Sequence, residues 1–354
     1  MLRLTRRTNP SRSLEILAPL VAVALTLVVA AILFVALGKN PADAFAAMFW
    51  RPVQDLYGWS ELGVKVAPLI LCAVGLAIGF RASVWNIGAE GQIVVGAIAA
   101  SWVALAIGDG GFGLPGWLLP LLAGALGGMV WGAIPALLRT KANANEILVS
   151  LMLVYVGGFL LQYVVRGPMR DPMSFGFPQS PMFPDPARLP ILLDTTRLHL
   201  GFALAILAAL VAWLFVARSC QGFVFRLSGE APAAAAYAGF SRAKVIWGSF
   251  LISGGLAGLA GAAEVLGPIG QLQPAVSPGY GFAAIIVAFL GRLHPIGIVA
   301  AALLMGLFYL GGEIAQMELQ LPIAITGVFQ GLLLFFLLGA DTFVRWRLVL
   351  RGTR

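Results

Sequence analysis

The stretch LEILAPLVAVALTLVVAAILFVAL, residues 14–37, decides the fold of this 354-residue chain. It carries a single charged side chain, that of Glu15. A membrane-spanning helix needs about 20 mostly apolar residues, because each residue rises about 1.5 Å through a hydrocarbon core of about 30 Å. The apolar region of a signal peptide is only about 7–15 residues long. We therefore interpret residues 14–37 as an uncleaved membrane helix.

The composition of the whole chain extends this interpretation. Hydrophobic residues make up 60% of the chain and charged residues 11%, against about 25% charged in soluble domains. The mean hydropathy is +0.93. A soluble core cannot hide so much apolar surface, which excludes a soluble enzyme, a nucleic-acid binder and a disordered scaffold. The net charge of +8 lies mainly between apolar runs, where it orients membrane helices and contacts anionic lipid, so we expect no nucleic-acid partner.

Further apolar runs predict an all-α polytopic membrane protein with about ten transmembrane segments. They lie near 14–37, 62–80, 84–107, 117–138, 147–165, 201–217, 245–266, 282–292, 294–313 and 322–340. The run at 282–292 is too short to span alone, and we expect a half helix buried among its neighbours. Residues 14–340 form a single transmembrane domain in this interpretation.

Positive charge fixes the orientation of these segments. With the N-terminus inside, 16 Lys and Arg residues fall on the cytoplasmic side and 7 on the outer side. Because positive residues are retained inside, both termini are predicted to be cytoplasmic. The tails are then residues 1–13 and 341–354, the long outer loop is 166–200, and the long cytoplasmic loop is 218–244.

The two long loops differ in composition. The outer loop contains seven prolines and predicts an ordered cap or short amphipathic pieces. The cytoplasmic loop contains the run Ala233 to Ala236 after Pro232. Alanine favours helix and proline suits the first turn, so we expect a short helix near 231–238 that ends at Gly239.

Glycines recur at helical spacing in several segments. Gly124, Gly128 and Gly132 form overlapping GxxxG steps, and Gly254 with Gly258 forms another. Such spacing lets helix backbones approach closely, for packing or for sliding. LLAGALGGMVWGA at 121–133 also resembles LISGGLAGLAGAA at 251–263. The two copies run in opposite directions through the membrane, which makes them a candidate inverted repeat.

The sequence offers no catalytic constellation. It lacks the patterns GxxxxGK[ST], HExxH, CxxC and GxSxG. Cys72 and Cys220, with His199 and His294, cannot build a metal cluster, and we expect no disulfide between the cysteines. We therefore predict no enzymatic activity, no catalytic residue, no cofactor and no metal.

Ionisable and amide side chains near membrane depth are the candidates for a pathway. Glu90 and Glu264 lie among small residues that leave room for a polar path, whereas Glu146 is interpreted as a helix cap. Capping is also an open reading for Glu90. Asn86 and Gln92 offer hydrogen bonds without charge. Gln271 lies in a proline-broken polar stretch that either lines a cavity or is an ordinary outer loop.

Five segments carry a family resemblance. They are NIGAEGQ at 86–92, KANANEILVSLMLVYV at 141–156, GPMRDP at 167–172, SGGLAGLAGAAEVLG at 253–267 and GYGFAAIIVAFLGRLHPIGI at 279–298. In this order they resemble the permease subunits of bacterial ABC importers for nucleosides and simple sugars, relatives of the ribose and branched-chain amino acid permeases. The resemblance covers about residues 60–340.

The resemblance implies a location in the bacterial inner membrane and a set of partners. These are a cytoplasmic ABC ATPase, a second permease subunit that is a different chain, and a periplasmic or lipid-anchored solute-binding protein. It also implies that the cytoplasmic loop docks on the ATPase through Gly229, Glu230, Ala234, Ala235 and Gly239. The sequence departs from the family pattern at Ala231, where relatives often have Asn, and at Ala283, where relatives often have an acid.

These features together predict a permease subunit that works by alternating access, with nucleosides as the favoured solute. ATP is hydrolysed in partner subunits. The alternative is an ion-coupled secondary transporter of a small polar solute, with Glu90 or Glu264 as the coupling carboxylate.

Overall fold

The computed structural model describes residues 2–6, 12–108, 115–322 and 324–350. It divides into two compact units, one made of Met1–Gly58 with Leu307–Arg354 and the other of Trp59–Gly306. Eight of the described helices are long and apolar enough to cross a membrane, and two shorter apolar helices accompany them. The predicted all-α polytopic fold is confirmed, and each of the ten predicted segments contains a helix.

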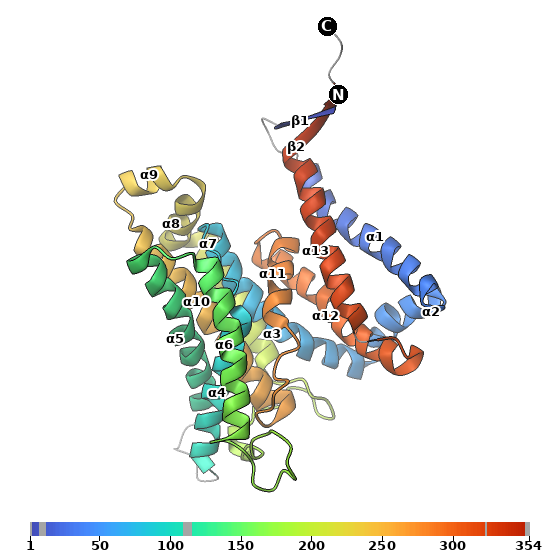
Figure 1. Ribbon diagram of the computed structural model, residues 1–354, viewed down its shortest axis with the longest axis vertical. Helices are drawn as coiled ribbons and strands as arrows, with labels where there is room; N and C mark the ends of the chain where they lie inside the picture. Colours follow the sequence, from blue (N-terminus) through green and yellow to red (C-terminus); the bar gives the residue numbers. More distant parts are fainter. Residues whose placement is uncertain (1, 7–11, 109–114, 323, 351–354) are drawn as a thin grey trace. The chain divides into compact units, whose positions relative to one another are not determined.

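The second unit contains most of the long helices and several short ones (Figure 1). They are α3 (Leu56–Arg81), α4 (Ala89–Ile107), α5 (Leu118–Ala142), α6 (Glu146–Arg166), η4 (Asp185–Ala187), α7 (Leu200–Arg218), α8 (Cys220–Glu230), α9 (Pro232–Tyr237), α10 (Arg242–Glu264), η5 (Val265–Ile269), α11 (Tyr280–Leu290) and the first half of α12 (Pro295–Leu319). Buried residues line α3 along nearly its whole length, which makes it a core helix.

Three helices, α4, α5 and α10, meet through glycine. A Cβ added at Gly128 would lie 2.1 Å from the carbonyl oxygen of Gly254, and one added at Gly258 would lie 2.2 Å from that of Gly124. A Cβ at Gly96 would lie 2.4 Å from the Cα of Gly258. The backbones therefore touch, as the GxxxG spacing predicts. Higher residue numbers on α5 contact lower ones on α10, so these two helices run antiparallel.

The predicted segment 84–107 begins well before its helix. Residues 84–88 of the segment 84–107 are not helical, and α4 begins at Ala89. The side chain of Asn86 accepts a hydrogen bond from the amide of Gly88 at 2.9 Å, which offers the backbone an alternative to helix. The chain therefore enters α4 through a buried, irregular connection at residues 82–88, which we call the α3–α4 connection.

Short helices depart from or extend the sequence expectations. The half helix expected at 282–292 is α11, which has eleven residues. The helix expected at 231–238 is α9, and Gly239 follows it with a left-handed φ of +83°. The cytoplasmic loop also contains α8, which the sequence did not predict. Its N-cap, Ser219, accepts a hydrogen bond from the amide of Gly222 at 2.8 Å.

The first unit joins the two ends of the chain. It contains β1 (Leu2–Arg6), α1 (Arg12–Ala36), α2 (Pro41–Phe45), η1 (Ala46–Trp50), η2 (Arg51–Val53), the second half of α12, α13 (Ala324–Arg345) and β2 (Trp346–Leu350). Helices α1 and α13 pack together through Phe34 and Phe329, whose ring centroids lie 5.6 Å apart. Strands β1 and β2 pair antiparallel, which supports the prediction that both termini lie on one side of the membrane.

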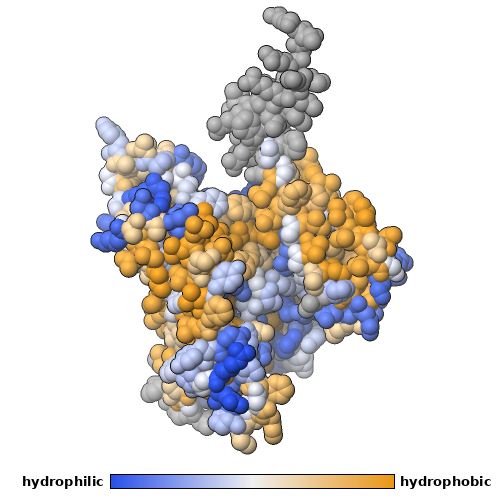
Figure 2. Space-filling model, viewed as in Figure 1, coloured by the Kyte–Doolittle hydropathy of each residue, from blue (hydrophilic) through white to orange (hydrophobic). Residues whose placement is uncertain are grey.

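The surface of the helices matches a bilayer. Figure 2 shows hydrophobic residues over the middle of α5 and α6, with hydrophilic residues towards the α8–α9 end. Exposed apolar side chains on α6 and α7, such as Phe159 and Leu210, belong to this surface. Lipid rather than water is the natural solvent for such a band.

Candidate functional site

A hydrogen-bonded polar cluster connects α4 with α10. Asn86 donates through Nδ2 to the hydroxyl of Ser253 at 2.8 Å and to Oε1 of Gln92 at 2.9 Å. Ser253 lies near the middle of α10, and all three side chains are buried. Two of the predicted pathway residues thus bind each other. In this conformation their mutual hydrogen bonds shape the start of α4.

Glu90, on the first turn of α4, contacts the start of α11. Its Oε2 accepts a hydrogen bond from the amide of Gly281 at 2.7 Å. Directly before α11, the hydroxyl of Ser277 accepts hydrogen bonds from the amides of Gly279 and Tyr280 at 3.3 and 3.1 Å. Carboxylates are favoured at helix N-termini, where free amide groups and the positive end of the helix dipole lie. Glu90 therefore caps α11, and it also lies in the first turn of α4.

The other two predicted pathway residues, Glu264 and Gln271, lie at and beyond the C-terminal end of α10. Glu264 is buried at the last position of α10, directly before the π-helical turn η5. Gln271 follows that turn, and its Nε2 donates to Oε1 of Gln179 at 3.3 Å. Gln179 belongs to the long outer connection, so Gln271 joins that connection and does not face the Asn86 cluster.

Backbone hydrogen bonds hold the long connection between α6 and α7. Its amides at Ser180 and Leu189 donate to the carbonyls of Leu272 and Leu266 at 2.9 Å each. Arg197 at its end binds the buried Glu61 of α3 through two hydrogen bonds, one of 2.9 Å from Nε to Oε1. The connection is therefore attached both to the end of α10 and to α3.

His199 lies where this connection enters α7. Its Nδ1 accepts a hydrogen bond from the amide of Gly201 at 3.1 Å and so caps the helix. The side chain is almost completely buried, and burial lowers the pKa of His199 to about 4. Its Nε2 has no hydrogen-bond partner among the described residues. At neutral pH the imidazole is therefore uncharged.

The predicted coupling residues gather on α8 and α9. Gly229 packs against α3, because an added Cβ would lie 2.1 Å from the carbonyl oxygen of Arg81. Glu230 is exposed and pairs loosely with Arg226 at 3.9 Å. Ala235 lies on the buried side of α9, whereas Ala234 lies on its exposed side. The five residues thus divide into an inner contact to α3 and an outer, accessible face.

Two residues of this region were not predicted from the sequence. Tyr237 ends α9 with a side chain that is 98% exposed, and a bulky aromatic group so placed is typical of a protein-binding anchor. The signal for it was present, because it is the one aromatic residue of the short helix PAAAAY. Arg81, the last residue of α3, donates through Nε to the carbonyl of Leu293 at 3.1 Å.

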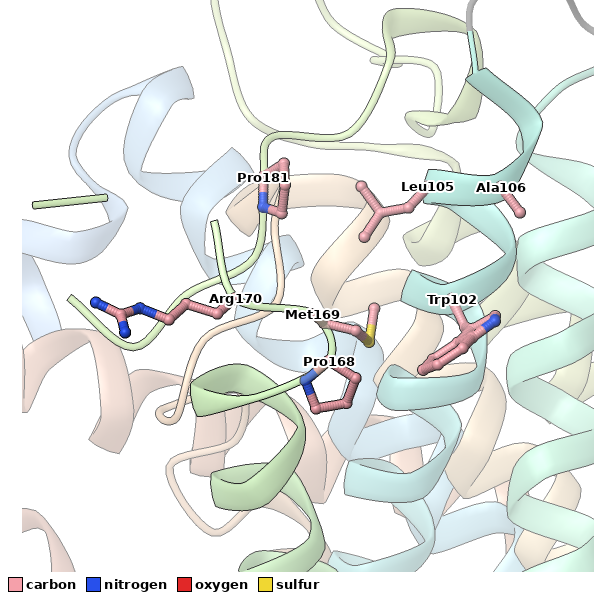
Figure 3. Close-up of a pocket in the computed structure, with 7 residues that line it drawn as sticks. All are labelled: Trp102, Leu105, Ala106, Pro168, Met169, Arg170 and Pro181. Carbon is pink, nitrogen blue, oxygen red and sulfur yellow. The ribbon is translucent and has the colours of Figure 1, made fainter. Parts of the chain in front are cut away.

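A surface pocket lies at the opposite end of the same unit. Its volume is about 440 Å³, and Trp102 and Leu105 of α4 form one wall (Figure 3). Pro168 and Met169, directly after α6, lie across from them, and the side chain of Arg170 extends away from the other side chains. The pocket is mainly apolar and none of the predicted site residues lines it.

The described residues contain no group of three His, Cys, Asp or Glu side chains that could hold a metal ion. Both cysteines are free, Cys72 buried and Cys220 exposed. The candidate site therefore consists of polar contacts between membrane helices, and the exposed short helices α8 and α9 lie next to it.

Comparison with known proteins gives a consistent result. Residues 59–338 match the family described as the branched-chain amino acid transport system / permease component. The chain is 36% identical to a glucose ABC transporter permease protein of Haloferax volcanii, over 97% of this chain and 92% of that one. It is 33% identical to a guanosine ABC transporter permease protein of Bacillus subtilis, over 96% and 98%. A nucleoside ABC transporter permease protein of Lactococcus lactis is 28% identical, over 92% of each.

Proposed function

This chain belongs to the family of permease components of branched-chain amino acid transport systems, and from that premise we propose how it carries a solute. As a permease it is the membrane-spanning component of an ABC importer in the inner membrane, and ATP is hydrolysed in a separate subunit. We propose that the imported solute is a nucleoside. The names of the Bacillus and Lactococcus relatives support this choice, whereas that of the Haloferax relative makes a simple sugar the competing solute.

The observation that carries the coupling proposal is the pair of helices α8 and α9. They project at one end of the second unit, and Tyr237 and Ala234 are exposed there while Gly229 touches the backbone of α3. The ATPase binds the exposed face in this proposal, and its movement reaches the membrane helices through the inner contact. Gly229, Glu230, Ala234, Ala235 and Gly239 are the proposed coupling residues.

A second permease subunit, encoded as a different chain, completes the pathway in this proposal. A periplasmic or lipid-anchored solute-binding protein delivers the solute to the ordered outer connection. Asn86, Glu90, Gln92, Glu264 and Gln271 are the proposed polar residues of the pathway. Because Asn86 donates to Ser253 of α10 here, this donor becomes available to a solute only when α4 and α10 move apart.

Substitution at Gly239 tests the coupling proposal. Its φ of +83° lies in the left-handed region that favours glycine, and it is exposed next to Tyr237. We expect Gly239→Arg to abolish uptake of labelled guanosine in cells while the amount of membrane-inserted protein stays unchanged. Uptake at the wild-type rate would refute the assignment of the loop.

The solute is tested with the same cells. Labelled guanosine and labelled glucose are supplied in turn to cells with and without this chain, and only guanosine uptake should depend on the chain. Accumulation of solute by the purified chain under an ion gradient, with no ATPase present, would instead support an ion-coupled transporter.

A further inference from the structure

Helix α11 is held at both of its ends by one short stretch of chain. It has eleven residues, which corresponds to roughly 16 Å and about half of the hydrocarbon core. The stretch comprises Phe80 to Glu90, that is, the end of α3, the α3–α4 connection and the start of α4. We call this stretch the bracket. The bracket and α11 belong to the same unit.

The first attachment is at the N-terminal end of α11. Glu90 accepts a hydrogen bond from the amide of Gly281 at 2.7 Å. The backbones also touch, because a Cβ added at Gly281 would lie 2.2 Å from the amide nitrogen of Glu90. Two helix N-termini, those of α4 and α11, thus meet around a single carboxylate. Its negative charge offsets the positive end of both helix dipoles.

The second attachment is at the C-terminal end of α11. Arg81 donates through Nε to the carbonyl of Leu293 at 3.1 Å. Phe80 and Trp85 stack on Phe289, with ring centroids 5.3 and 5.9 Å away. A cation is favourable at this end, where the dipole is negative. The bracket therefore places a negative charge at the N-terminal end of α11 and a positive charge at its C-terminal end, where the helix dipole favours each of them.

The bracket also touches the helices proposed to receive the ATPase. The Cα of Gly229, the penultimate residue of α8, lies so close to Arg81 that no side chain fits between them. The hydroxyl of Ser83 donates to the carbonyl of Gly229 at 3.4 Å. The bracket is thus in contact with α8 on one side and with α11 on the other.

We propose that Glu90 and Arg81 are positioning residues that make the bracket and α11 move as one body. A displacement of α8 then reaches the polar turn at residues 277–280, which leads into α11. The inference rests on the proposed function, since it needs an ATPase to move α8. In this inference Glu90 contributes to the pathway through its attachment to α11, and it binds neither the solute nor a coupling ion.

The chemistry of Glu90 supports this assignment. The amide of Gly281 already binds its carboxylate, and this buried donor at the start of α11 would lose its acceptor if the carboxylate turned to a solute. Movement of α11 against α4 would break this bond and the backbone contact between Gly281 and Glu90. Movement of α4 and α11 as one body keeps both.

The test uses the complete transporter in proteoliposomes, with its ATPase, second permease and solute-binding protein. Glu90→Gln keeps the size of the side chain and removes its charge. Glu146→Gln is the matched control, because Glu146 is also a first-turn carboxylate, on α6, and binds Arg139 at 3.2 Å instead of α11. Uptake of labelled guanosine and ATP hydrolysis are measured in the same vesicles.

We expect Glu90→Gln to lower the uptake per ATP hydrolysed by about tenfold or more, a typical size for coupling between two sites. Glu146→Gln should stay within about twofold of wild type. Glu90→Asp, which keeps the charge on a shorter side chain, should recover part of the loss. A higher KM with an unchanged ratio of uptake to hydrolysis would identify Glu90 as a solute contact and overturn the proposal.

Arg81→Lys provides the second variant if Glu90→Gln does not fold. Lysine keeps the charge but loses the Nε donor to Leu293, so uptake per ATP should also fall. A variant in which uptake and hydrolysis fall in equal proportion would show a merely structural role. Absence of ATP-dependent uptake in the wild-type transporter would contradict the proposed function instead, and this control separates the two failures.

Distances in the transporter give an independent readout. Spin labels at Ser83→Cys and His294→Cys, both exposed positions, are placed in a chain that lacks Cys72 and Cys220. The distance between the labels is measured by pulsed electron resonance with and without a trapped nucleotide. One rigid body predicts the same distance in both states. A change of several ångströms in a transport-competent labelled protein would overturn the proposal.

Discussion

Substitution of Gly258 by alanine measures how closely three membrane helices must approach. The added Cβ would lie 2.2 Å from the carbonyl oxygen of Gly124. Ordinary contact begins at 3.4 Å, so α5 and α10 would have to separate by the difference, 1.2 Å. A gap of about 1 Å forfeits up to half of the dispersion energy of each contact that it opens. Overpacking of this kind costs about 1–3 kcal/mol.

The expected value is near the upper end, because Gly96 of α4 also lies against Gly258. The control is Gly158→Ala on α6, where the added Cβ has nothing within 4 Å. Both substitutions gain up to about 1 kcal/mol of helix propensity, so this term cancels in the difference between the two variants. We expect Gly258→Ala to be less stable than Gly158→Ala by about 2–3 kcal/mol.

The assay is reversible unfolding of the purified chain in mixed micelles, followed by tryptophan fluorescence as the denaturing detergent is increased. Uptake is measured in parallel, since a wider α5–α10 spacing also displaces α4. Equal unfolding free energies for the two alanine variants would refute the close approach of the backbones. A crossing of α5 and α10 with enough space for the added methyl group would give that result.

Three further predictions concern stability. Arg197→Met removes both donors from the buried carboxylate of Glu61 and should cost about 2–3 kcal/mol in unfolding free energy, which Glu61→Gln in the same chain should largely restore. His199, with its pKa lowered to about 4 by burial, takes up a proton on unfolding. Its contribution is therefore complete above about pH 6.5 and should fall by up to about 3 kcal/mol as the pH drops towards 4. His199→Asn keeps the cap on Gly201 and should make thermal midpoints less dependent on pH between 7.5 and 4.5. Asn86→Ala leaves the amide of Gly88 without its acceptor and should destabilise the chain by about 2 kcal/mol, as measured by the same detergent titration.

The membrane helices could be predicted from the sequence because their signal is local. A run of some 20 apolar residues defines a span without reference to any other part of the chain. The short helix α11 was predicted for the same reason, since 282–292 is too short to span. The helix α8 was missed because its sequence, CQGFVFRLSGE, mixes charge with apolar residues and offers only a capping serine as a signal.

The polar site was only partly predictable, because its geometry depends on long-range contacts. The sequence placed Asn86, Glu90 and Gln92 in one motif, and the motif does lie at a buried break between helices. It could not show that Glu90 binds Gly281, which lies 191 positions away. The contact of Arg81 with Leu293, which spans 212 positions, was out of reach of the sequence for the same reason.

The candidate inverted repeat shows which part of the second unit is symmetric and which part is not. Exchanging 121–133 with 251–263 converts the contact between Gly124 and Gly258 into that between Gly254 and Gly128, and both contacts occur. An antiparallel pair related by a two-fold axis must show this reciprocity. The helices that follow the two copies do not obey the symmetry, because α6 has 21 residues and α11 has eleven. The shortening of α11 brings a polar turn to the start of α4, and Glu90 is the residue that meets it there.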